Sequence, residues 1–222
     1  AMLVDPLENF NKMKGLNTIK QKIVNNVIFF LKKGKKFGQI WNIAIYGPPG
    51  VGKTTIAKHI ANIYSNVGIL TTNKVSSVKR SDLIGKYLGE TAIKTQNVIN
   101  DIKGGILLID EVYSLGHTEK RDSFSKECLD TLTHNLGQEN TDFICIVAGY
   151  EDDVKACFFA HNKGLQRRFP FVYRINGYDA TVMSDLMCSK LIDDGWTITP
   201  EEKGTITKFV DKNKEKFENF MG

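Results

Sequence analysis

Apolar residues recur along the chain in two patterns: short continuous runs, and stretches in which they return every three or four positions. The first stretch of the second kind starts at Thr18 and carries the apolar positions of one helix face: Ile19, Ile23, Val27 and Phe30. Asn17 is suited to cap this helix, and Gly34, after the lysines, is suited to end it. We therefore predict an opening helix between Asn17 and Gly34.

Apolar runs and helical stretches then alternate. The runs that predict strands are Asn42–Tyr46, Ile106–Ile109 and Phe143–Ala148. Three helices are predicted between and beside these runs. The first has an apolar face of Ile56, Ala57, Ile60, Ala61 and Tyr64, the second spans Thr91–Lys103, and the third has an apolar face of Leu129, Leu132 and Leu136 and ends at Gly137. Strands that are apolar throughout and alternate with helices are typical of a parallel sheet covered on both faces. We predict an α/β domain over residues 1–175.

Beyond about Ile175 the pattern is helical only. One helix carries the stripe Met183, Leu186, Met187 and Leu191 and ends at Asp194-Gly195. Another starts at Thr199-Pro200-Glu201-Glu202, which has the form of a capping box with proline at the first helical position. We expect residues 176–222 to begin a small helical domain that is not finished at Gly222.

The composition is that of an ordinary globular protein, with 222 residues of which 41% are hydrophobic and 25% charged. No apolar run approaches the roughly 20 residues that span a bilayer. The start of the chain also lacks the basic and apolar regions of a signal peptide. We expect a soluble, cytoplasmic protein that does not contact a membrane.

The distribution of charge and the spacing of cysteines and histidines argue against a nucleic-acid partner and against a zinc site. The net charge of +5 does not indicate a nucleic-acid partner, because the lysines are spread along the chain. Their one tight group suits the carboxyl end of the opening helix: Lys32, Lys33, Lys35 and Lys36. The cysteines and histidines lack the spacing of metal ligands, so we expect structural thiols and no zinc site.

The residues after the first predicted strand match the phosphate-binding pattern G-x-x-x-x-G-K-S/T in full. They are Gly47, Pro48, Pro49, Gly50, Val51, Gly52, Lys53 and Thr54, followed by Thr55. The glycines let backbone N–H groups approach phosphate oxygens, the lysine supplies a charge to the β and γ phosphates, and the threonine offers a hydroxyl to Mg²⁺. Because the match lies between a strand and a helix, a chance turn is disfavoured. We predict binding of ATP with Mg²⁺.

Two acidic residues end the second apolar strand, where a doubly wound sheet exposes its ligand-binding crevice. Asp110 is placed to hold Mg²⁺ through water, and Glu111 to orient and deprotonate the attacking water. Adjacent acids at a strand end are, taken alone, more often solvated loop residues. Beside a phosphate loop they indicate phosphoryl chemistry.

These two motifs resemble those of the AAA+ ATPases, and five segments narrow the resemblance to the CbxX/CfqX branch, which contains the red-type rubisco activases. In chain order they are GPPGVGKTTIAKHIANIY, DLIGKYLGETAIKT, GGILLIDEVYSL, VAGYEDDV and NKGLQRRF, and the likeness spans about residues 10–175. The resemblance implies a P-loop NTPase fold of the AAA+ class: a parallel sheet with helices on both faces, followed by a partial helical lid.

The resemblance also implies site residues that spacing alone does not. The ATP site would lie between subunits of a ring, expected to be a hexamer when nucleotide is bound. Arg168 of a neighbour would be the arginine finger, with Arg167 as the alternative. Tyr150 occupies the position of a polar sensor, where it either orients water or only packs. The segment that packs on adenine resembles Met13, Gly15 and Leu16.

A loop ahead of the helix at Thr91 matches the aromatic–hydrophobic–glycine pattern that lines the pore of threading relatives. It consists of Tyr87, Leu88 and Gly89, and a mobile aromatic side chain suits sequence-independent contact with a polypeptide. A buried tyrosine before a helix is the alternative. The arginine of the family's second sensor would follow Gly222, so no residue is assigned to it.

Three functions fit these residues. The leading hypothesis is ATP-driven remodelling of a protein partner, whose identity the sequence does not indicate. A scaffold that changes shape with ATP but does not thread its partner is the second. A nucleic-acid loader is the third, and the diffuse distribution of lysines argues against it.

Overall fold

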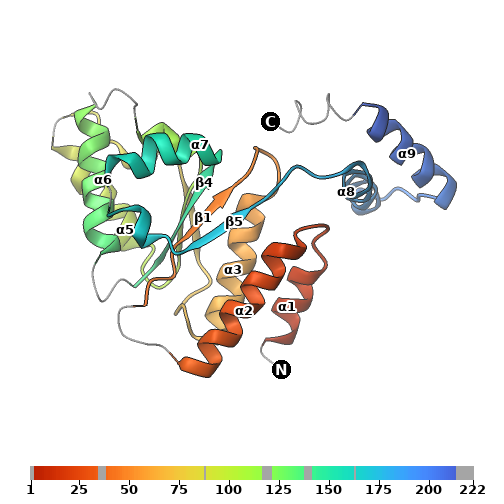
Figure 1. The fold of residues 1–222 in the computed structure, drawn as a ribbon, viewed down its shortest axis with the longest axis horizontal. Coiled ribbons are helices and arrows are strands. Elements are labelled where there is room, and N and C mark those ends of the chain that lie inside the picture. The colour runs from red at the N-terminus through yellow and green to blue at the C-terminus, as the bar shows by residue number, and fades with distance from the viewer. Residues whose placement is uncertain are drawn as a thin grey trace.

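A parallel sheet of five strands forms the centre of the fold (Figure 1). The computed structural model describes residues 3–34, 39–87, 89–116, 122–137, 142–162 and 164–213. The strands are β1 (Ile43–Tyr46), β2 (Val75–Val78), β3 (Ile106–Ile109), β4 (Ile144–Gly149) and β5 (Phe171–Arg174). Their order across the sheet is β2-β3-β4-β1-β5, and every neighbouring pair is parallel. All carboxyl ends of the strands therefore reach the same edge of the sheet.

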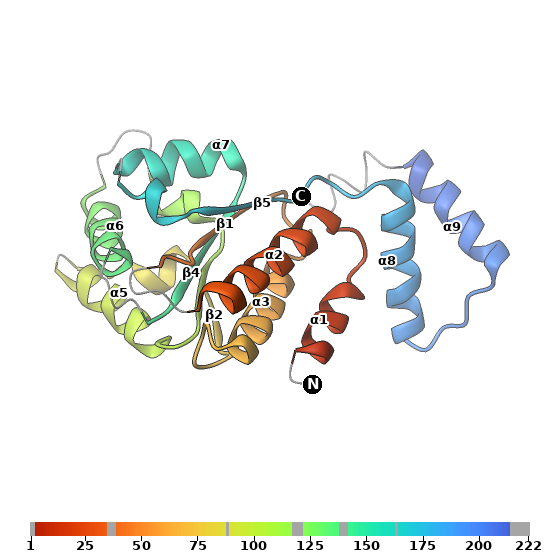
Figure 2. The same ribbon diagram turned by 60° about the horizontal axis from the view of Figure 1, so that its bottom comes forward.

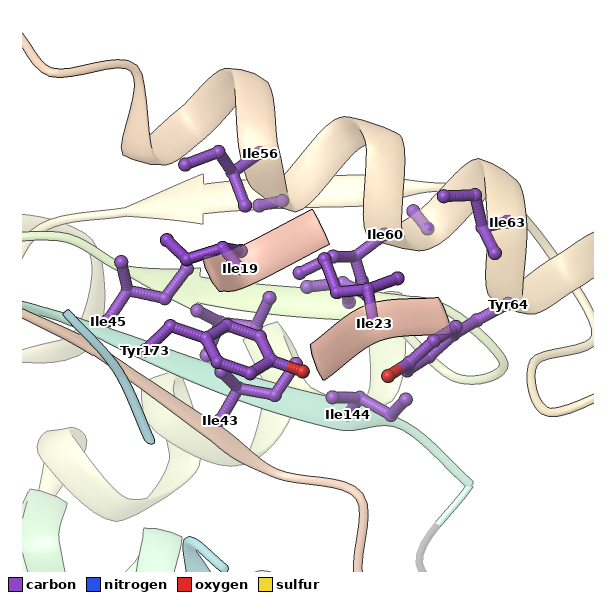
Figure 3. Packing of buried hydrophobic residues seen from close by; sticks show 14 of the residues in the cluster. Ile19, Ile23, Ile43, Ile45, Ile56, Ile60, Ile63, Tyr64, Ile144 and Tyr173 are labelled. Carbon is purple, nitrogen blue, oxygen red and sulfur yellow. The ribbon is translucent and has the colours of Figure 1, made fainter. Parts of the chain in front are cut away.

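Successive strand residues point to opposite faces, and each face has its own helices. Ile43 and Ile45 of β1 belong to a buried cluster with α1 (Val4–Asn11), α2 (Asn17–Lys33) and α3 (Lys53–Val67). Figure 3 shows Ile19 and Ile23 of α2 meeting side chains from α3 and from the strands. Each such buried side chain contributes about 1.5–3 kcal/mol to folding.

The opposite face is covered by helices from later in the chain. Ala44 and Tyr46 of β1 face a second buried cluster, which includes α5 (Glu90–Asp101) and α6 (Ser123–Leu136). Short helical turns complete this layer: α4 (Arg80–Leu83), η1 (Val112–Leu115), α7 (Glu151–Asp153), the π-helical turn η2 (Val154–Phe158), η3 (Phe159–His161) and η4 (Gln166–Arg168). The sheet thus lies between two helical layers.

Two further helices follow β5 and pack against each other to one side of the sheet (Figure 2). They are α8 (Ala180–Asp193) and α9 (Pro200–Lys212). Thr199 caps α9 with Glu202 in the predicted capping box, and Pro200 is its first residue. The predicted stripe on α8 is only partly buried, because Leu186 and Met187 are exposed while Met183 and Cys188 are covered.

The three predicted strands and the helices between them are confirmed, and so is the fold class. The opening helix ends at Gly34 as predicted, but its cap is wrong. Leu16 occupies the N-cap position in a left-handed conformation, and Asn17 is already helical. The pattern also missed α1 and the two outermost strands, β2 and β5.

In the described part of the chain, none of the helices is both long enough and apolar enough to cross a membrane.

Candidate nucleotide-binding site

The loop after β1 has the backbone of a phosphate cradle. Gly50 and Gly52 have φ of 76° and 84°, a conformation that residues with a Cβ rarely adopt. Gly47 donates its N–H to the carbonyl of Gly149 at 3.1 Å, which fixes the loop to the end of β4. A Cβ at Gly47 would lie 2.9 Å from the carbonyl oxygen of Ile175. Since α3 begins directly at Lys53, its free N–H groups point into the loop.

Lys53 is held inside this loop by the loop's own carbonyl groups. Its Nζ donates to the carbonyl oxygen of Pro48 at 2.8 Å and to that of Gly47 at 3.3 Å. The residue is only 7% exposed. Burial lowers the pKa of its ammonium group, while the nearby carboxylates of Asp110 and Glu111 act in the opposite direction. The acid pair therefore partly offsets the cost of burying the charge.

The acid pair follows β3 in an unusual backbone conformation. The N–H of Asp110 donates to the carbonyl of Val78 at 3.2 Å, and one carboxylate oxygen of Asp110 accepts from the N–H of Glu111 at 3.0 Å. Glu111 has φ of 52° and ψ of 42°, in the left-handed region. This conformation is uncommon for a residue with a long side chain, and such strain gathers at functional sites.

A cavity of about 280 Å³ lies between the loop and the acid pair. It is lined by Gly47, Pro49, Gly50, Gly52, Lys53, Thr54, Thr55, Asp110, Glu111, Tyr113, Gly149 and Tyr150. The lining fits a nucleotide phosphate group with a metal ion: backbone N–H groups and Lys53 can meet phosphate oxygens, and Thr54 and Asp110 offer the oxygen ligands that Mg²⁺ prefers. Pro48 and Val51 belong to the loop but do not line the cavity.

Two tyrosines complete the cavity wall. Tyr150 directly follows β4 and is 42% exposed. Tyr113, which the motifs did not identify, lies so close to Gly149 that a Cβ there would be 3.1 Å from its ring. Burial raises the pKa of the Tyr113 hydroxyl, and the charge of Glu111 adds to this. Tyr113 therefore stands beside the acid pair as a neutral hydrogen-bonding group.

The segment predicted to contact adenine lies next to the phosphate loop. Met13 Cε would be 4.0 Å from a Cβ at Gly52, and Gly15 and Leu16 both have positive φ, of 66° and 62°. Tyr178, also missed by the motifs, donates from its hydroxyl to the carbonyl of Val51 at 2.9 Å. A Cβ at Gly15 would lie 3.3 Å from the Tyr178 ring. Tyr178 thus joins the loop, this segment and the start of the α8–α9 region.

The predicted arginine finger does not line this cavity. Arg168 on η4 donates from Nη1 to the carbonyl of Gly164 at 2.8 Å, and its guanidinium packs against Gly137. Its Nε is buried without a hydrogen-bond partner among the described residues. Arg167 is exposed. The two candidates therefore differ in environment: Arg168 is folded onto its own chain, and Arg167 is exposed.

The predicted pore loop also lies apart from the cavity. Tyr87 is 70% exposed, so the alternative of a buried tyrosine is wrong. Its backbone N–H donates to a carboxylate oxygen of Glu90 at 3.2 Å, at the start of α5. Leu88 lies outside the described residues, and Gly89 has φ of 85°.

Comparison with known proteins supports a family assignment. Residues 43–170 match the family model "ATPase family associated with various cellular activities (AAA)". The chain is 39% identical over 221 residues to a cfxQ-like protein of Acanthamoeba polyphaga mimivirus, covering 99% of this chain and 54% of that protein. It is 37% identical over 164 residues to stage V sporulation protein K of Bacillus subtilis, covering 74% and 49%. It is 31% identical over 176 residues to the chloroplastic ribulose bisphosphate carboxylase/oxygenase activase of Cyanidioschyzon merolae, covering 78% and 59%.

The fold has a solved counterpart. The AAA domain of FIGL-1, crystallised with ADP, superposes with a TM-score of 0.65 at 19% identity, over 90% of this chain and 66% of that one. The chain spans about half the length of the curated relatives it matches. The chain belongs to the AAA family of ATPases, in the group of the CfxQ-like proteins.

Proposed function

We propose that this chain binds ATP with Mg²⁺ in the cavity at the carboxyl edge of the sheet and hydrolyses it. One observation carries this proposal: the cavity brings Lys53 and Thr54, at the start of α3, together with the acid pair that follows β3. These are the groups that phosphoryl transfer requires, because its catalysis rests on positioning and charge stabilisation.

Each residue then has a role. The backbone N–H groups of Gly50 and Gly52 and the ammonium of Lys53 hold the phosphates, and Lys53 exchanges its bonds to the loop carbonyls for phosphate oxygens. Mg²⁺ held by Thr54 and Asp110 would screen the phosphate charge. Glu111 accepts a proton from the water whose oxygen attacks the γ-phosphorus, while the bond to the β–γ bridging oxygen breaks. Tyr150, which lines the same cavity, would act as the sensor of this water.

We further propose that hydrolysis needs a second copy of the chain. The cavity lining contains no arginine from its own subunit among the described residues, and an arginine at the developing charge is worth about 10³- to 10⁵-fold in rate. Arg168 or Arg167 of a neighbour would supply it. A closed ring, with six subunits as the expected number, brings one such arginine to each site. Helices α8 and α9 would begin the lid domain of each subunit.

The work of hydrolysis is remodelling of a protein partner. The exposed Tyr87 ring supports this proposal, because an aromatic side chain on an anchored loop can press on an extended polypeptide of any sequence. The free thiols of Cys128, Cys145, Cys157 and Cys188 support a reducing, cytoplasmic setting.

The first test measures ATP turnover per chain against protein concentration, with and without Mg²⁺, alongside particle mass with ATP. Turnover per chain that rises with concentration and needs Mg²⁺, together with a ring-sized particle, is the expected result. Turnover that is independent of concentration would remove the neighbour's arginine from the mechanism. Tyr87→Ala then separates threading from scaffolding, because a scaffold would keep its partner-directed activity.

A further inference from the structure

Arg80 joins three segments of the chain on the face of the sheet that carries α5 and α6. It is the first residue of α4, and its Nη1 donates to the carbonyl oxygen of Ser114 at 2.7 Å and to the hydroxyl of Ser125 at 2.7 Å. Its Nη2 forms an ion pair with the carboxylate of Asp122. The segments α4, η1 and α6 therefore meet at one guanidinium group, which we call the Arg80 clasp.

The partners of the clasp hold one another in place. Asp122 caps α6 by accepting from the N–H groups of Phe124 at 3.0 Å and Ser125 at 3.2 Å, and the Ser125 hydroxyl donates to Asp122 at 2.7 Å. Burial alone would raise the pKa of Asp122, but hydrogen bonds from Ser125 and Arg80 outweigh it and lower the pKa to about 2. The carboxylate is therefore charged at neutral pH, and Arg80 is held in one orientation.

Hydrogen bonds connect the Arg80 clasp to the acid pair on one side. The N–H of Ser114 donates to the carbonyl of Glu111 at 2.8 Å, and the Ser114 carbonyl accepts from Arg80. The N–H of Asp110 donates to Val78, two residues before Arg80. The segment 110–114 is thus bonded near both of its ends to the segment 78–80.

Hydrogen bonds connect the Arg80 clasp to the Tyr87 loop on the other side. The carbonyl of Arg80 accepts from Ile84, and the next residue, Gly85, donates its N–H to the hydroxyl of Thr91 at 3.1 Å. Tyr87 donates its N–H to Glu90. These bonds connect the base of the loop to α4 and to the start of α5.

We propose that Arg80 is a positioning residue that couples the state of the acid pair to the Tyr87 loop. When the segment 110–114 shifts with the bound nucleotide, its hydrogen bond from Arg80 to the Ser114 carbonyl moves Arg80. Arg80 then moves α4 and the Tyr87 loop. Arginine suits this role because its planar fork holds several acceptors at fixed angles, whereas lysine presents a single point charge. The inference rests on the proposed function, since the loop's movement matters only if the loop acts on a partner.

The test compares wild-type chain with Arg80→Ala, Arg80→Lys and the control Lys203→Ala, which removes an ion pair with Asp185 in the α8–α9 region. Hydrogen exchange of the amides over residues 81–95 is measured with a non-hydrolysable ATP analogue and with ADP. Nucleotide affinity, ATP turnover and thermal midpoint are measured on the same samples. ATP turnover of the wild type reports on the proposed function separately from this exchange.

We expect exchange over residues 81–95 to differ between the two nucleotides in wild type and in Lys203→Ala. We expect that difference to be lost in both Arg80 variants, while nucleotide affinity is kept. Arg80→Lys should stay near the wild-type thermal midpoint, because it keeps a charge beside Asp122; a purely structural role would let it keep the exchange difference too. A wild-type loop that does not respond to nucleotide, or an Arg80→Lys loop that responds fully, would overturn the inference.

Discussion

The Nζ of Lys53 lies 2.8 Å from the carbonyl oxygen of Pro48, so the lysine of the phosphate loop is bonded to the loop that it serves. In the proposed function, phosphate oxygens replace these carbonyls, and the exchange of a neutral acceptor for a charged one favours binding.

Replacing this lysine tests the nucleotide site directly. A hydrogen bond to a charged group is worth about 1.5–3 kcal/mol, so Lys53→Ala should weaken ATP binding by about 10- to 100-fold. Titration with a fluorescent ATP analogue measures the loss. Lys58, exposed on the same helix, is the matched control, and Lys58→Ala should bind as wild type. Equal affinities for both variants would mean that ATP binds elsewhere.

Glu111→Gln separates binding from chemistry. The amide keeps the shape of the side chain but accepts a proton poorly, so turnover should fall by about 10²- to 10⁴-fold while ATP affinity is unchanged. Single-turnover hydrolysis and equilibrium binding on the same sample check both parts. Turnover at the normal rate would assign the base to another residue.

Mixing experiments can identify the arginine finger. Arg168→Ala alone should lose about 10³-fold or more in turnover. Adding Glu111→Gln subunits should restore part of it, because their intact Arg168 would face the intact acid pair of Arg168→Ala subunits. If Arg167 is the finger, only Arg167→Ala subunits will be rescued in this way. No rescue of either variant would contradict an arginine acting between subunits.

The packing of Arg168 against Gly137 allows a test that substitutes neither arginine. Gly137 has φ of −99°, which alanine adopts freely, but a Cβ there would collide with the Arg168 guanidinium. Gly137→Ala should therefore displace Arg168 and change the concentration dependence of turnover. An unchanged dependence would favour Arg167.

The lowered pKa of Asp122 predicts a pH-dependent stability. A carboxyl group with a folded-state pKa of about 2, against 3.8 when unfolded, stabilises the fold above about pH 4 and loses this contribution as pH falls toward 2. Because the pair is partly exposed, we expect only about 1 kcal/mol. Urea unfolding of wild type and Asp122→Asn, which keeps the helix cap, should show a gap at pH 7 that narrows by pH 3. A gap that is constant with pH would exclude this origin.

The features that could be predicted from the sequence are those that depend on consecutive residues. The phosphate loop is contiguous, and the central strands are apolar on both faces, so a local pattern reveals both. The outer strands β2 and β5 have only one neighbour and are partly exposed, which removes the continuous apolar run.

The missed site residues are those defined by contacts between distant segments. Tyr113 is recognised by its contact with Gly149, and Tyr178 by its bond to Val51. Neither contact can be recognised from the spacing of residues along the chain. Arg168 was predicted, but its packing against Gly137 was not, because that packing depends on where α6 ends. The cap of the opening helix was mispredicted because Leu16 adopts a conformation that leucine rarely takes.

Under the proposed function, the left-handed backbone of Glu111 sets activity against stability. Holding a residue with a long side chain at φ of 52° costs about 1–3 kcal/mol. Glycine and asparagine adopt this conformation more readily. Either replacement would relieve strain while removing the carboxylate. If Glu111 is the proposed base, selection for thermal resistance alone would favour replacements at this position that abolish hydrolysis, and a stabilised laboratory version should leave residue 111 unchanged.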